Sequence, residues 1–292
     1  MVDYKSDVHE EIISANGVDL YTVSMGDGVP VVFVHGAAGL GHSYFLPAAK
    51  ELASEFKTIS YDQRGCGRSS AVSLSEITLA NHLEDLEGLR QKLGMKRLNL
   101  VGHSLGALLA LFYSAKYPGS VASLVIANAG PPFIPEMLEQ LGREFARRKT
   151  TEDKVELKRI MESTEFKNRD PRTVEQYFTI LYKPFFKGPA IMSRLNWGFT
   201  ETTAQHVVEG EEHIVPQIFQ QDPVSKLSEI SSPALVLHSE QDPIPEAFSL
   251  FLAERIKGAQ YLAMQGVGHF AYLEDPEKFR NAILPFLLKE AK

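Results

Sequence analysis

The sequence predicts an α/β fold whose central, mostly parallel sheet is covered by helices on both faces. Short β-rich runs alternate with helical patterns in the first half of the 292-residue chain and again near its end, and this alternation is typical of parallel sheets. Val31–Val34 is a continuous apolar run, as expected of a strand buried on both faces. The chain is 44% hydrophobic and 23% charged, which is ordinary for a globular protein.

The first expected element is a hairpin. Asn16-Gly17 lies between the β-rich runs Glu11–Ala15 and Leu20–Ser24, and Asn-Gly is a strong signal for a two-residue turn. The sheet is therefore expected to be antiparallel at one edge. The other expected strands are Val31–Val34, Lys57–Tyr61, Leu98–Val101, Val121–Ala127, Ala234–His238 and Gln260–Met264.

Helices are expected between these strands, where apolar residues recur three or four positions apart. Leu79, Leu83 and Leu86 are an example. The expected helices are Phe45–Phe56, Leu79–Leu93, Leu105–Lys116, Ala247–Ile256 and Pro276–Lys289.

The middle of the chain follows a different pattern. From Pro131 to Val224 it has helical periodicity and prolines but few convincing strands. We interpret residues 131–224 as a helical cap (lid) inserted into a core domain made of residues 1–130 and 225–292.

Charge and composition argue against several classes of partner. The formal net charge of −7 gives no reason to expect nucleic acid or an anionic membrane surface. No stretch reaches the roughly 18 apolar residues of a membrane helix, and the polar, acidic amino terminus is unlike a secretory signal. Cys66 is the only cysteine, so no intrachain disulfide can form. We expect a cytoplasmic protein that binds a small molecule; its oligomeric state stays open.

The segment Gly102-His103-Ser104-Leu105-Gly106 matches the nucleophile-elbow pattern G-x-S-x-G, with a predicted strand before it and a predicted helix after it. An abrupt strand-to-helix turn strains the central residue, and the residues two positions away must be small to avoid a clash. The strain leaves the serine hydroxyl exposed at the carboxyl edge of the sheet. Ser104 is therefore the predicted nucleophile, and the His103 side chain is expected to point away from it.

A serine nucleophile needs a general base. In elbow-type enzymes the chain order is Ser, then Asp or Glu, then His. His269 lies in the glycine-rich loop Gly266–Phe270, after the last strand and before the last helix. That loop reaches the carboxyl edge of the sheet, so His269 is the predicted base.

The base needs a carboxylate that orients it. Glu240 and Asp242 both follow the strand Ala234–His238, and Asp242 is favoured because it sits deeper in the loop. The other loop that can hold the acid in such a fold follows Val121–Ala127. It carries Asn128 and no carboxylate, which strengthens the assignment of Asp242.

Backbone N–H groups are expected to stabilise the oxyanion, because they are preorganised. One donor is expected at Leu105, directly after the nucleophile. The other is expected in the loop His35–Gly39, whose small residues let backbone approach the substrate. Ala37 is the preferred donor there, with Ala38 as the second choice.

Two further groups of residues have weaker assignments. The segment Asp62-Gln63-Arg64-Gly65-Cys66-Gly67-Arg68-Ser69 is expected to form a tight turn in which Asp62 and Arg64 brace neighbouring loops. Cys66 is not expected to be a nucleophile, because the elbow already supplies the serine. Aromatic residues of the cap either line an apolar acyl pocket or pack the cap itself: Tyr182, Phe185, Phe186, Trp197 and Phe199.

Together these motifs resemble the α/β-hydrolase fold family over essentially the whole chain. The His-Gly loop, the D-x-R-G-x-G-x-S segment, the elbow, the Asp-Pro loop and the Gly-His loop occur in that family's order. The resemblance implies an α/β-hydrolase core with a helical cap. Ser104 separates the chain from haloalkane dehalogenases and epoxide hydrolases, which use an aspartate nucleophile. The chemistry needs no metal or organic cofactor.

Within that family the Asp62–Ser69 segment looks most like prolyl iminopeptidases, although the HGGPG of that branch is replaced here by His35–Gly39. That branch also uses acidic cap residues to hold the free amine of its substrate. The candidates for this role are Glu201, Glu209, Glu211 and Glu212.

The sequence therefore favours a serine hydrolase that cleaves small or medium acyl substrates, most simply carboxyl esters, through an acyl-enzyme. One alternative is an aminopeptidase that releases amino-terminal proline. A second is a ligand-binding protein that keeps the scaffold without turnover.

Overall fold

Eight strands form a single sheet in the computed structural model, which describes residues 8–37, 39–192, 194–195 and 197–291. Their order is β1-β2-β4-β3-β5-β6-β7-β8. The strands are β1 (His9–Ala15), β2 (Val18–Met25), β3 (Pro30–Val34), β4 (Lys57–Tyr61), β5 (Leu98–His103), β6 (Val121–Ala127), β7 (Ala234–Ser239) and β8 (Gln260–Met264). β2 is antiparallel to β1 and β4, and the remaining pairs are parallel.

The edge hairpin forms at the predicted turn. Asn16 and Gly17 have φ angles of 47° and 78°, and two positive φ values in succession are what a type I′ turn requires. Ala15 pairs with Val18 directly beside the turn. The predicted antiparallel edge is thus confirmed.

Core helices connect the strands. They are α1 (Leu46–Leu52), α2 (Leu79–Lys92), α3 (Leu105–Lys116), α11 (Glu246–Arg255), α12 (Ala271–Glu274) and α13 (Pro276–Glu290), with short 3-10 turns η1 (His42–Phe45), η2 (Leu74–Glu76) and η3 (Pro118–Ser120). The predicted helix Phe45–Phe56 is shorter in the structure and is preceded by η1.

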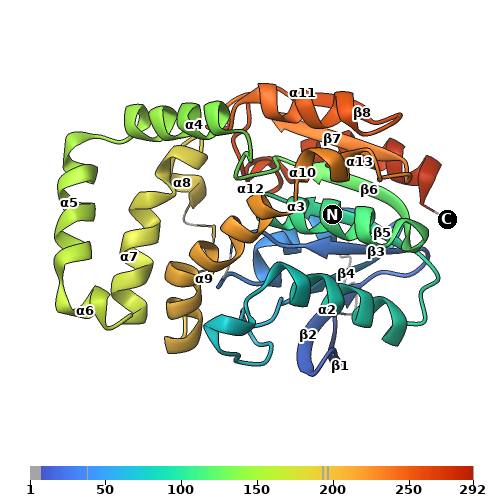
Figure 1. Ribbon diagram of the computed structural model, residues 1–292, viewed down its shortest axis with the longest axis horizontal. Helices are drawn as coiled ribbons and strands as arrows, with labels where there is room; N and C mark the ends of the chain where they lie inside the picture. Colours follow the sequence, from blue (N-terminus) through green and yellow to red (C-terminus); the bar gives the residue numbers. More distant parts are fainter. Residues whose placement is uncertain (1–7, 38, 193, 196, 292) are drawn as a thin grey trace, which may run out of the picture.

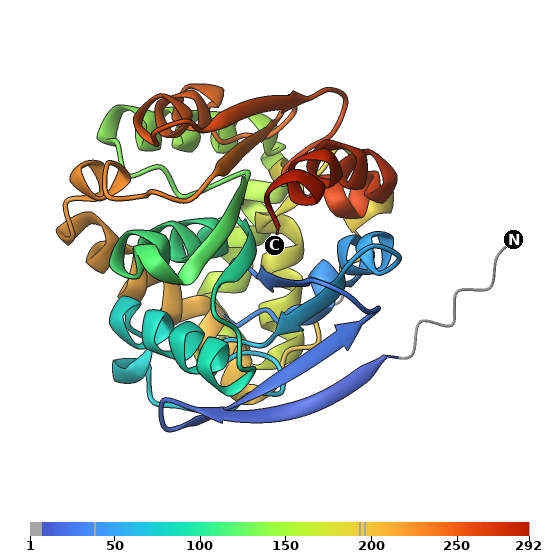
Figure 2. The same ribbon diagram turned by 90° about the vertical axis from the view of Figure 1, so that its right-hand side faces the viewer.

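The helices cover the sheet on both faces because successive residues of the buried strands point to opposite sides. Val32 and Val34 of β3 pack in one hydrophobic cluster with α2, α3 and α11, whereas Val31 and Phe33 pack in a second cluster with α1, α12 and α13. Figure 2 shows α1 and α13 on one side of the sheet and α2 and α3 on the other. The predicted α/β architecture is confirmed.

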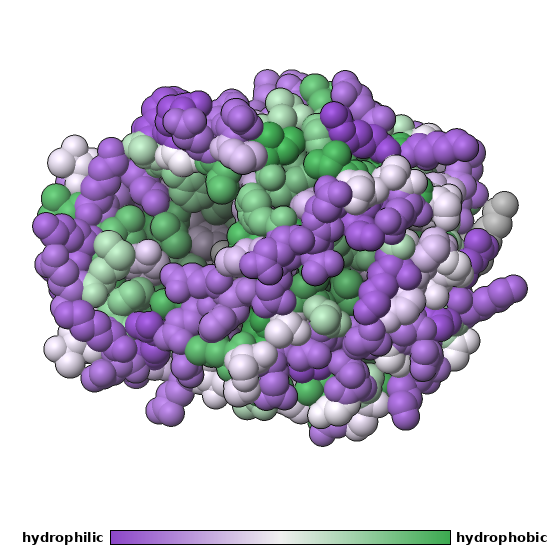
Figure 3. All heavy atoms as spheres, in the orientation of Figure 1, coloured by the Kyte–Doolittle hydropathy of each residue, from purple (hydrophilic) through white to green (hydrophobic). Residues whose placement is uncertain are grey.

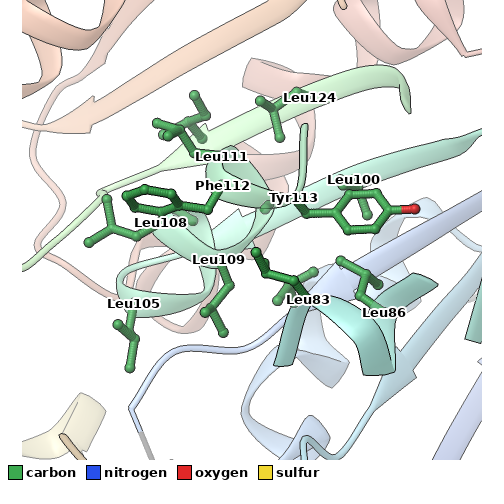
Figure 4. Close-up of a cluster of buried hydrophobic side chains, with 14 of the residues drawn as sticks. Leu83, Leu86, Leu100, Leu105, Leu108, Leu109, Leu111, Phe112, Tyr113 and Leu124 are labelled. Atoms are coloured by element: carbon green, nitrogen blue, oxygen red, sulfur yellow. The ribbon is translucent and has the colours of Figure 1, made fainter. Parts of the chain in front are cut away.

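Helix α3, which follows the elbow, is buried over almost its whole length. Every residue from Leu105 to Ala115 is buried, as expected of a helix that is apolar on all sides. Figure 4 shows Leu109 of α3 beside Leu83 of α2, and Tyr113 of α3 beside Leu86 of α2 and Leu100 of the sheet. This packing holds the amino terminus of α3 at the sheet edge.

Between β6 and β7 the described residues form helices and no strands. They are α4 (Pro135–Arg148), α5 (Thr151–Glu162), α6 (Thr164–Lys167), α7 (Pro171–Leu181), η4 (Lys183–Phe185), α8 (Pro189–Met192), α9 (Glu201–Gln220) and α10 (Pro223–Leu227). Figure 1 shows α4 to α9 to the left of the sheet. We call residues 135–227 the insertion. The expected boundary after residue 224 falls inside α10, and a separate cap domain stays a prediction.

The parallel strands bring their carboxyl ends to one edge. His103 at the end of β5 pairs with Ala127, and Ala127 pairs with Leu237 of β7. The ladder continues beyond the strands, because Ser104 N–H donates to Ala127 O at 3.1 Å and Asn128 N–H to Leu237 O at 3.1 Å. The loops that follow β5, β6 and β7 therefore start side by side.

The first prediction concerns the stability of the elbow. A Cβ on Gly106 would collide with the backbone carbonyl oxygens of Val34 and His35. Because backbone cannot give way as a flexible side chain can, Gly106→Ala should lower the free energy of unfolding by about 3 kcal/mol or more. Urea denaturation measures this change.

Gly142→Ala is the matched control, because Gly142 lies within α4 and a Cβ there meets nothing within 4 Å. This variant should be as stable as the wild type or up to about 1 kcal/mol more stable, since alanine favours the helix. Equal unfolding midpoints for the two variants would contradict the prediction.

Candidate active site

Ser104 sits in a strained conformation between β5 and α3. Its φ and ψ angles are 54° and −124°, a region that a non-glycine residue occupies only at a cost of about 1–3 kcal/mol. Gly102 allows the turn, because a Cβ there would lie 2.7 Å from the Cα of Ala107. This is the local geometry that the elbow pattern predicts.

His269 and Asp242 are joined by a buried hydrogen bond. The Nδ1 atom of His269 lies 2.7 Å from Oδ2 of Asp242, and the two side chains are 2% and 0% exposed. A carboxylate can only accept, so Nδ1–H is the donor and Nε2 is left with its lone pair. This tautomer leaves Nε2 able to take up a proton.

The Asp242 carboxylate has two more donors. Ile244 N–H donates to Oδ1 at 2.9 Å, and the Asn128 amide donates to Oδ2 at 2.5 Å. The hydroxyl of Ser239 in turn donates to Asn128 Oδ1 at 3.2 Å. From the sequence, Asn128 had no role beyond marking a loop without a carboxylate. In the structure it helps to hold the Asp242 side chain from that neighbouring loop.

Glu240, the alternative acid, lies elsewhere. It is exposed, and its Oε2 accepts the N–H of Gly266 at 2.8 Å. Of the two candidates, the structure brings Asp242 to His269.

Ser104 and His269 line one small pocket of about 20 Å³, roughly the space of a single water molecule. Its lining residues are Gly36, Ala37, Leu40, Tyr44, His103, Ser104, Tyr182, Phe185, His269 and Phe270. Figure 3 shows a hollow on the face of the molecule where the insertion helices lie, with hydrophobic residues above it and to its left and hydrophilic residues below it. The surroundings of the serine are therefore apolar and narrow.

The peptide between Gly36 and Ala37 is anchored by the side chain of His35. The Nδ1–H of His35 donates to the Gly36 carbonyl at 2.8 Å, and Nε2 of His35 accepts the N–H of Gln63 at 3.1 Å. The carbonyl and N–H of a trans peptide point in opposite directions, so anchoring the Gly36 oxygen directs the Ala37 N–H away from His35. Ala37 adopts a left-handed φ of 44°; Ala38 lies outside the described residues.

The second expected donor is Leu105, the first residue of α3. Its N–H has no acceptor within the helix, because the first N–H groups of an α-helix point beyond its end. The helix dipole adds partial positive charge at the same place. Leu105 is therefore suited to stabilise a developing oxyanion.

His103, whose side chain was expected to point away from Ser104, packs against His269. Its ring centroid is 4.5 Å from that of His269, and its Nε2–H donates to the His269 carbonyl at 2.8 Å. Its Nδ1 accepts from the Tyr44 hydroxyl at 3.1 Å, and that hydroxyl accepts the Gly36 N–H. A neutral His103 thus connects the base loop to the oxyanion loop.

The segment after β4 has the bracing role expected of it. Asp62 accepts from His42 Nδ1 at 2.8 Å and from Arg68 N–H at 2.8 Å. Burial alone would raise the pKa of Asp62, but these hydrogen bonds outweigh it and lower the pKa. Arg64 instead binds Asp85 of α2 through two hydrogen bonds of 2.7 and 2.6 Å.

Cys66 is buried beside the oxyanion loop, and its Sγ accepts the N–H of Gly39 at 3.2 Å. Burial raises the pKa of its thiol to about 12, so the thiol stays protonated and poorly nucleophilic. This agrees with the expectation that Cys66 is not the nucleophile.

Two of the five expected aromatic residues, Tyr182 and Phe185, line the pocket. Phe185 lies over the imidazole of His269, with ring centroids 4.4 Å apart. The other three pack behind this layer: Phe186 stacks on Phe270, Trp197 lies against Tyr182, and Phe199 lies against Trp197.

Sequence reasoning missed Leu40, Tyr44 and Phe270 as lining residues. Phe270 directly follows His269, so adjacency to the base was an available signal. Tyr44 and Leu40 belong to the chain that continues from the oxyanion loop, and their apolar character alone did not distinguish them from core residues.

None of the acidic insertion residues with a described side chain lines this pocket. Glu209 is paired with Arg169 at 2.7 Å, and Glu201 and Glu212 are exposed. The Glu211 side chain lies outside what the structure describes. No carboxylate is among the described pocket-lining residues.

Residues 29–276 match the family described as the alpha/beta hydrolase fold. The chain belongs to this family. As an alpha/beta hydrolase it is an enzyme of the hydrolase class.

Curated relatives of this alpha/beta hydrolase match nearly its whole length. A proline iminopeptidase of Saccharolobus solfataricus is 25% identical over 98% of this chain and 94% of its own. A putative carbamate hydrolase of Pantoea ananatis is 26% identical over 91% of this chain and 90% of its own. An esterase structure from Exiguobacterium antarcticum superposes with a TM-score of 0.70 at 21% identity, covering 96% of this chain and all of that one, which shows a shared fold.

None of the helices in the described ranges has both the length and the apolar character needed to cross a bilayer. A cytoplasmic location stays a prediction.

The second prediction concerns stability at low pH. Burial lowers the pKa of His35 to about 4, from an ordinary value of 6.5. Between pH 6.5 and 4 the unfolded chain therefore binds more protons than the folded chain. The contribution of neutral His35 to the free energy of unfolding is complete above this window and is lost as the pH falls through it. For His35 alone the loss is about 3 kcal/mol, measurable by urea denaturation at several pH values.

His35→Asn keeps a donor near Nδ1 and removes the titrating ring, so its stability should fall less steeply across that window. Burial also lowers the pKa values of His82, His103 and His238, so part of the slope should remain. His9→Asn, at an exposed position of β1, is the control. Identical slopes for His35→Asn and the wild type would refute the prediction.

Proposed function

We propose that this alpha/beta hydrolase is a serine hydrolase that cleaves carboxyl esters with small or medium acyl groups. Ser104 is the nucleophile, His269 the base and Asp242 the orienting acid. The observation that carries the proposal is the buried 2.7 Å hydrogen bond from His269 to Asp242, next to a strained serine that lines the same pocket as the imidazole.

The reaction follows from the proton positions. His269 Nε2 takes the Ser104 proton as Oγ attacks the ester carbonyl carbon, and Asp242 stabilises the resulting imidazolium. The N–H groups of Ala37 and Leu105 stabilise the negative charge on the carbonyl oxygen. His269 then protonates the departing alcohol. A water molecule, deprotonated by the same imidazole, attacks the acyl-enzyme, and collapse of the second intermediate returns the proton to Ser104 as the acid is released.

The pocket lining supports a neutral, largely apolar acyl group. Leu40, Phe185 and Phe270 contribute apolar surface around Ser104, and apolar surface favours groups that lose little hydration on binding. The small volume favours short acyl chains in this conformation.

The third prediction tests the proposed residues. Purified protein should hydrolyse p-nitrophenyl esters of short acids, and Ser104→Ala should lower kcat/KM by a factor of roughly 10⁴ or more. Asp242→Asn should lose roughly 10⁴-fold, because the amide favours the wrong imidazole tautomer. Steady-state hydrolysis and labelling by a fluorophosphonate measure both effects.

Glu240→Gln is the matched control for Asp242→Asn, since it makes the same chemical change two residues away at a carboxylate that does not touch His269. Its kcat/KM should stay close to that of the wild type. A wild-type chain that neither turns over esters nor reacts with the fluorophosphonate would contradict the proposal and favour a ligand-binding protein.

The second candidate function is release of amino-terminal proline. The similarity to proline iminopeptidases, extending over 98% of the chain in one case, favours it. The pocket argues against it, because the described lining residues offer no carboxylate to a free amine.

The fourth prediction separates these two activities. Prolyl-arylamide should be a poor substrate relative to the best p-nitrophenyl ester. Blocking its amine should not weaken turnover, because the described lining residues include no carboxylate that could pair with the amine. Parallel assays of the free and N-blocked arylamides measure this. Strong turnover of the free form, abolished by the block, would replace the esterase proposal with the peptidase.

A further inference from the structure

Arg148, the last residue of α4, reaches from the insertion to the loop that carries the proposed acid. Its Nη1 donates to the Gln241 carbonyl at 2.6 Å, and its Nη2 lies 3.4 Å from the Asp242 carbonyl. The same Nη1 donates to the Pro184 carbonyl in η4 at 3.0 Å. One guanidinium therefore contacts three backbone oxygens in two segments far apart in sequence.

The η4 segment in turn holds the loop of the proposed base. Pro184 precedes Phe185, whose carbonyl accepts the His269 N–H at 2.9 Å. The Phe185 ring also covers the imidazole. Through Pro184 and Phe185, Arg148 is connected to the backbone of His269 as well as to that of Asp242.

The acid and base loops have a direct contact of their own, from Gln241 N–H to the Val267 carbonyl at 3.0 Å. Arg148 binds the carbonyl of that same Gln241, so it acts on the peptide segment that aligns the two loops. Glu144, one turn earlier in α4, lies 3.3 Å from Arg148 Nε and directs the guanidinium.

Arginine is suited to this position for a geometric reason. Its planar guanidinium presents several N–H donors in a fixed arrangement, so it can bind separate acceptors at once, whereas lysine offers a flexible point charge. Backbone carbonyls supply the acceptors here, and Glu144 supplies the opposite charge.

We propose that Arg148 is a positioning residue for the active site, whose guanidinium locks the Asp242 loop and the His269 loop to the same segment of the insertion. This inference rests on the proposed roles of Asp242 and His269. Its consequence is that the insertion does more than cover the pocket, because it sets the distance between acid and base. Displacements of about 1 Å in such groups can cost about 100-fold in rate.

The fifth prediction compares Arg148→Met with Arg147→Met. Both variants remove an arginine that contacts Glu144. Arg147, however, is 69% exposed, and among the described residues its side chain donates only to Glu144. Arg148→Met should lower kcat on a short p-nitrophenyl ester by about 10- to 100-fold with little change in KM, because alignment and not substrate binding is lost. Arg147→Met should retain wild-type kcat.

Chemical rescue separates positioning from a general structural effect. Arg148 borders a polar cavity of about 380 Å³ that Asp242 also lines, so Arg148→Ala leaves a space that guanidinium ion can enter. Millimolar guanidinium should restore part of the lost kcat to Arg148→Ala, and potassium at the same ionic strength should not. Arg148→Lys should have a kcat between those of the wild type and Arg148→Met. If Arg148→Met does not fold, Arg148→Lys is compared with Arg147→Met in its place.

A readout independent of turnover is hydrogen–deuterium exchange over residues 239–243 and 266–270. Exchange there should be faster in Arg148→Met or Arg148→Lys than in Arg147→Met. Unchanged exchange and kcat in the Arg148 variants, or no rescue of folded Arg148→Ala, would overturn the proposal. A different outcome is faster exchange of these loops in the Arg148 variants of a protein that shows no Ser104-dependent hydrolysis. That outcome would refute the proposed function but would still show that Arg148 holds the two loops.

Discussion

The strained backbone at Ser104 is the constraint on which the candidate site depends. A turn from strand to helix within one residue requires glycine at 102 and 106, because a side chain at either position would meet backbone of α3 or β3. The same close approach brings the start of α3 against the end of β3, where the His35–Gly39 loop begins. One steric condition therefore places the proposed nucleophile and both expected oxyanion donors, and the buried leucines of α3 stabilise this arrangement.

Sequence reasoning was most successful where a rule acts over a few residues. The apolar run at Val31–Val34 and the Asn16-Gly17 turn are local features with one main structural solution. The proximity of Asp242 and His269 follows in the same way, since each lies in a loop after a parallel strand and such loops share one edge. The preference for Asp242 over Glu240 required only its greater depth in the loop.

The residues that support these groups could not be inferred in this way. His103 binds the carbonyl of a residue 166 positions later, and Asn128 binds Asp242 across 114 positions. Arg148 contacts a loop 93 positions away. No periodicity or motif connects partners at such separations, because they meet only when distant segments of the chain pack together. For Arg148 that packing is between the insertion and the core. The contacts of the His103 ring with Tyr44 and His269 were not foreseen either, because the elbow pattern describes only the backbone around Ser104.

The burial of Cys66 beneath the Gly39 amide has a practical consequence for work with this protein. A neutral, enclosed thiol reacts slowly with alkylating reagents and mild oxidants, and it is the only cysteine in the chain. A cysteine introduced at an exposed position of the insertion can therefore carry a fluorescent label with Cys66 left in place. Movement of the insertion relative to the core then becomes accessible to spectroscopy on an otherwise unaltered protein.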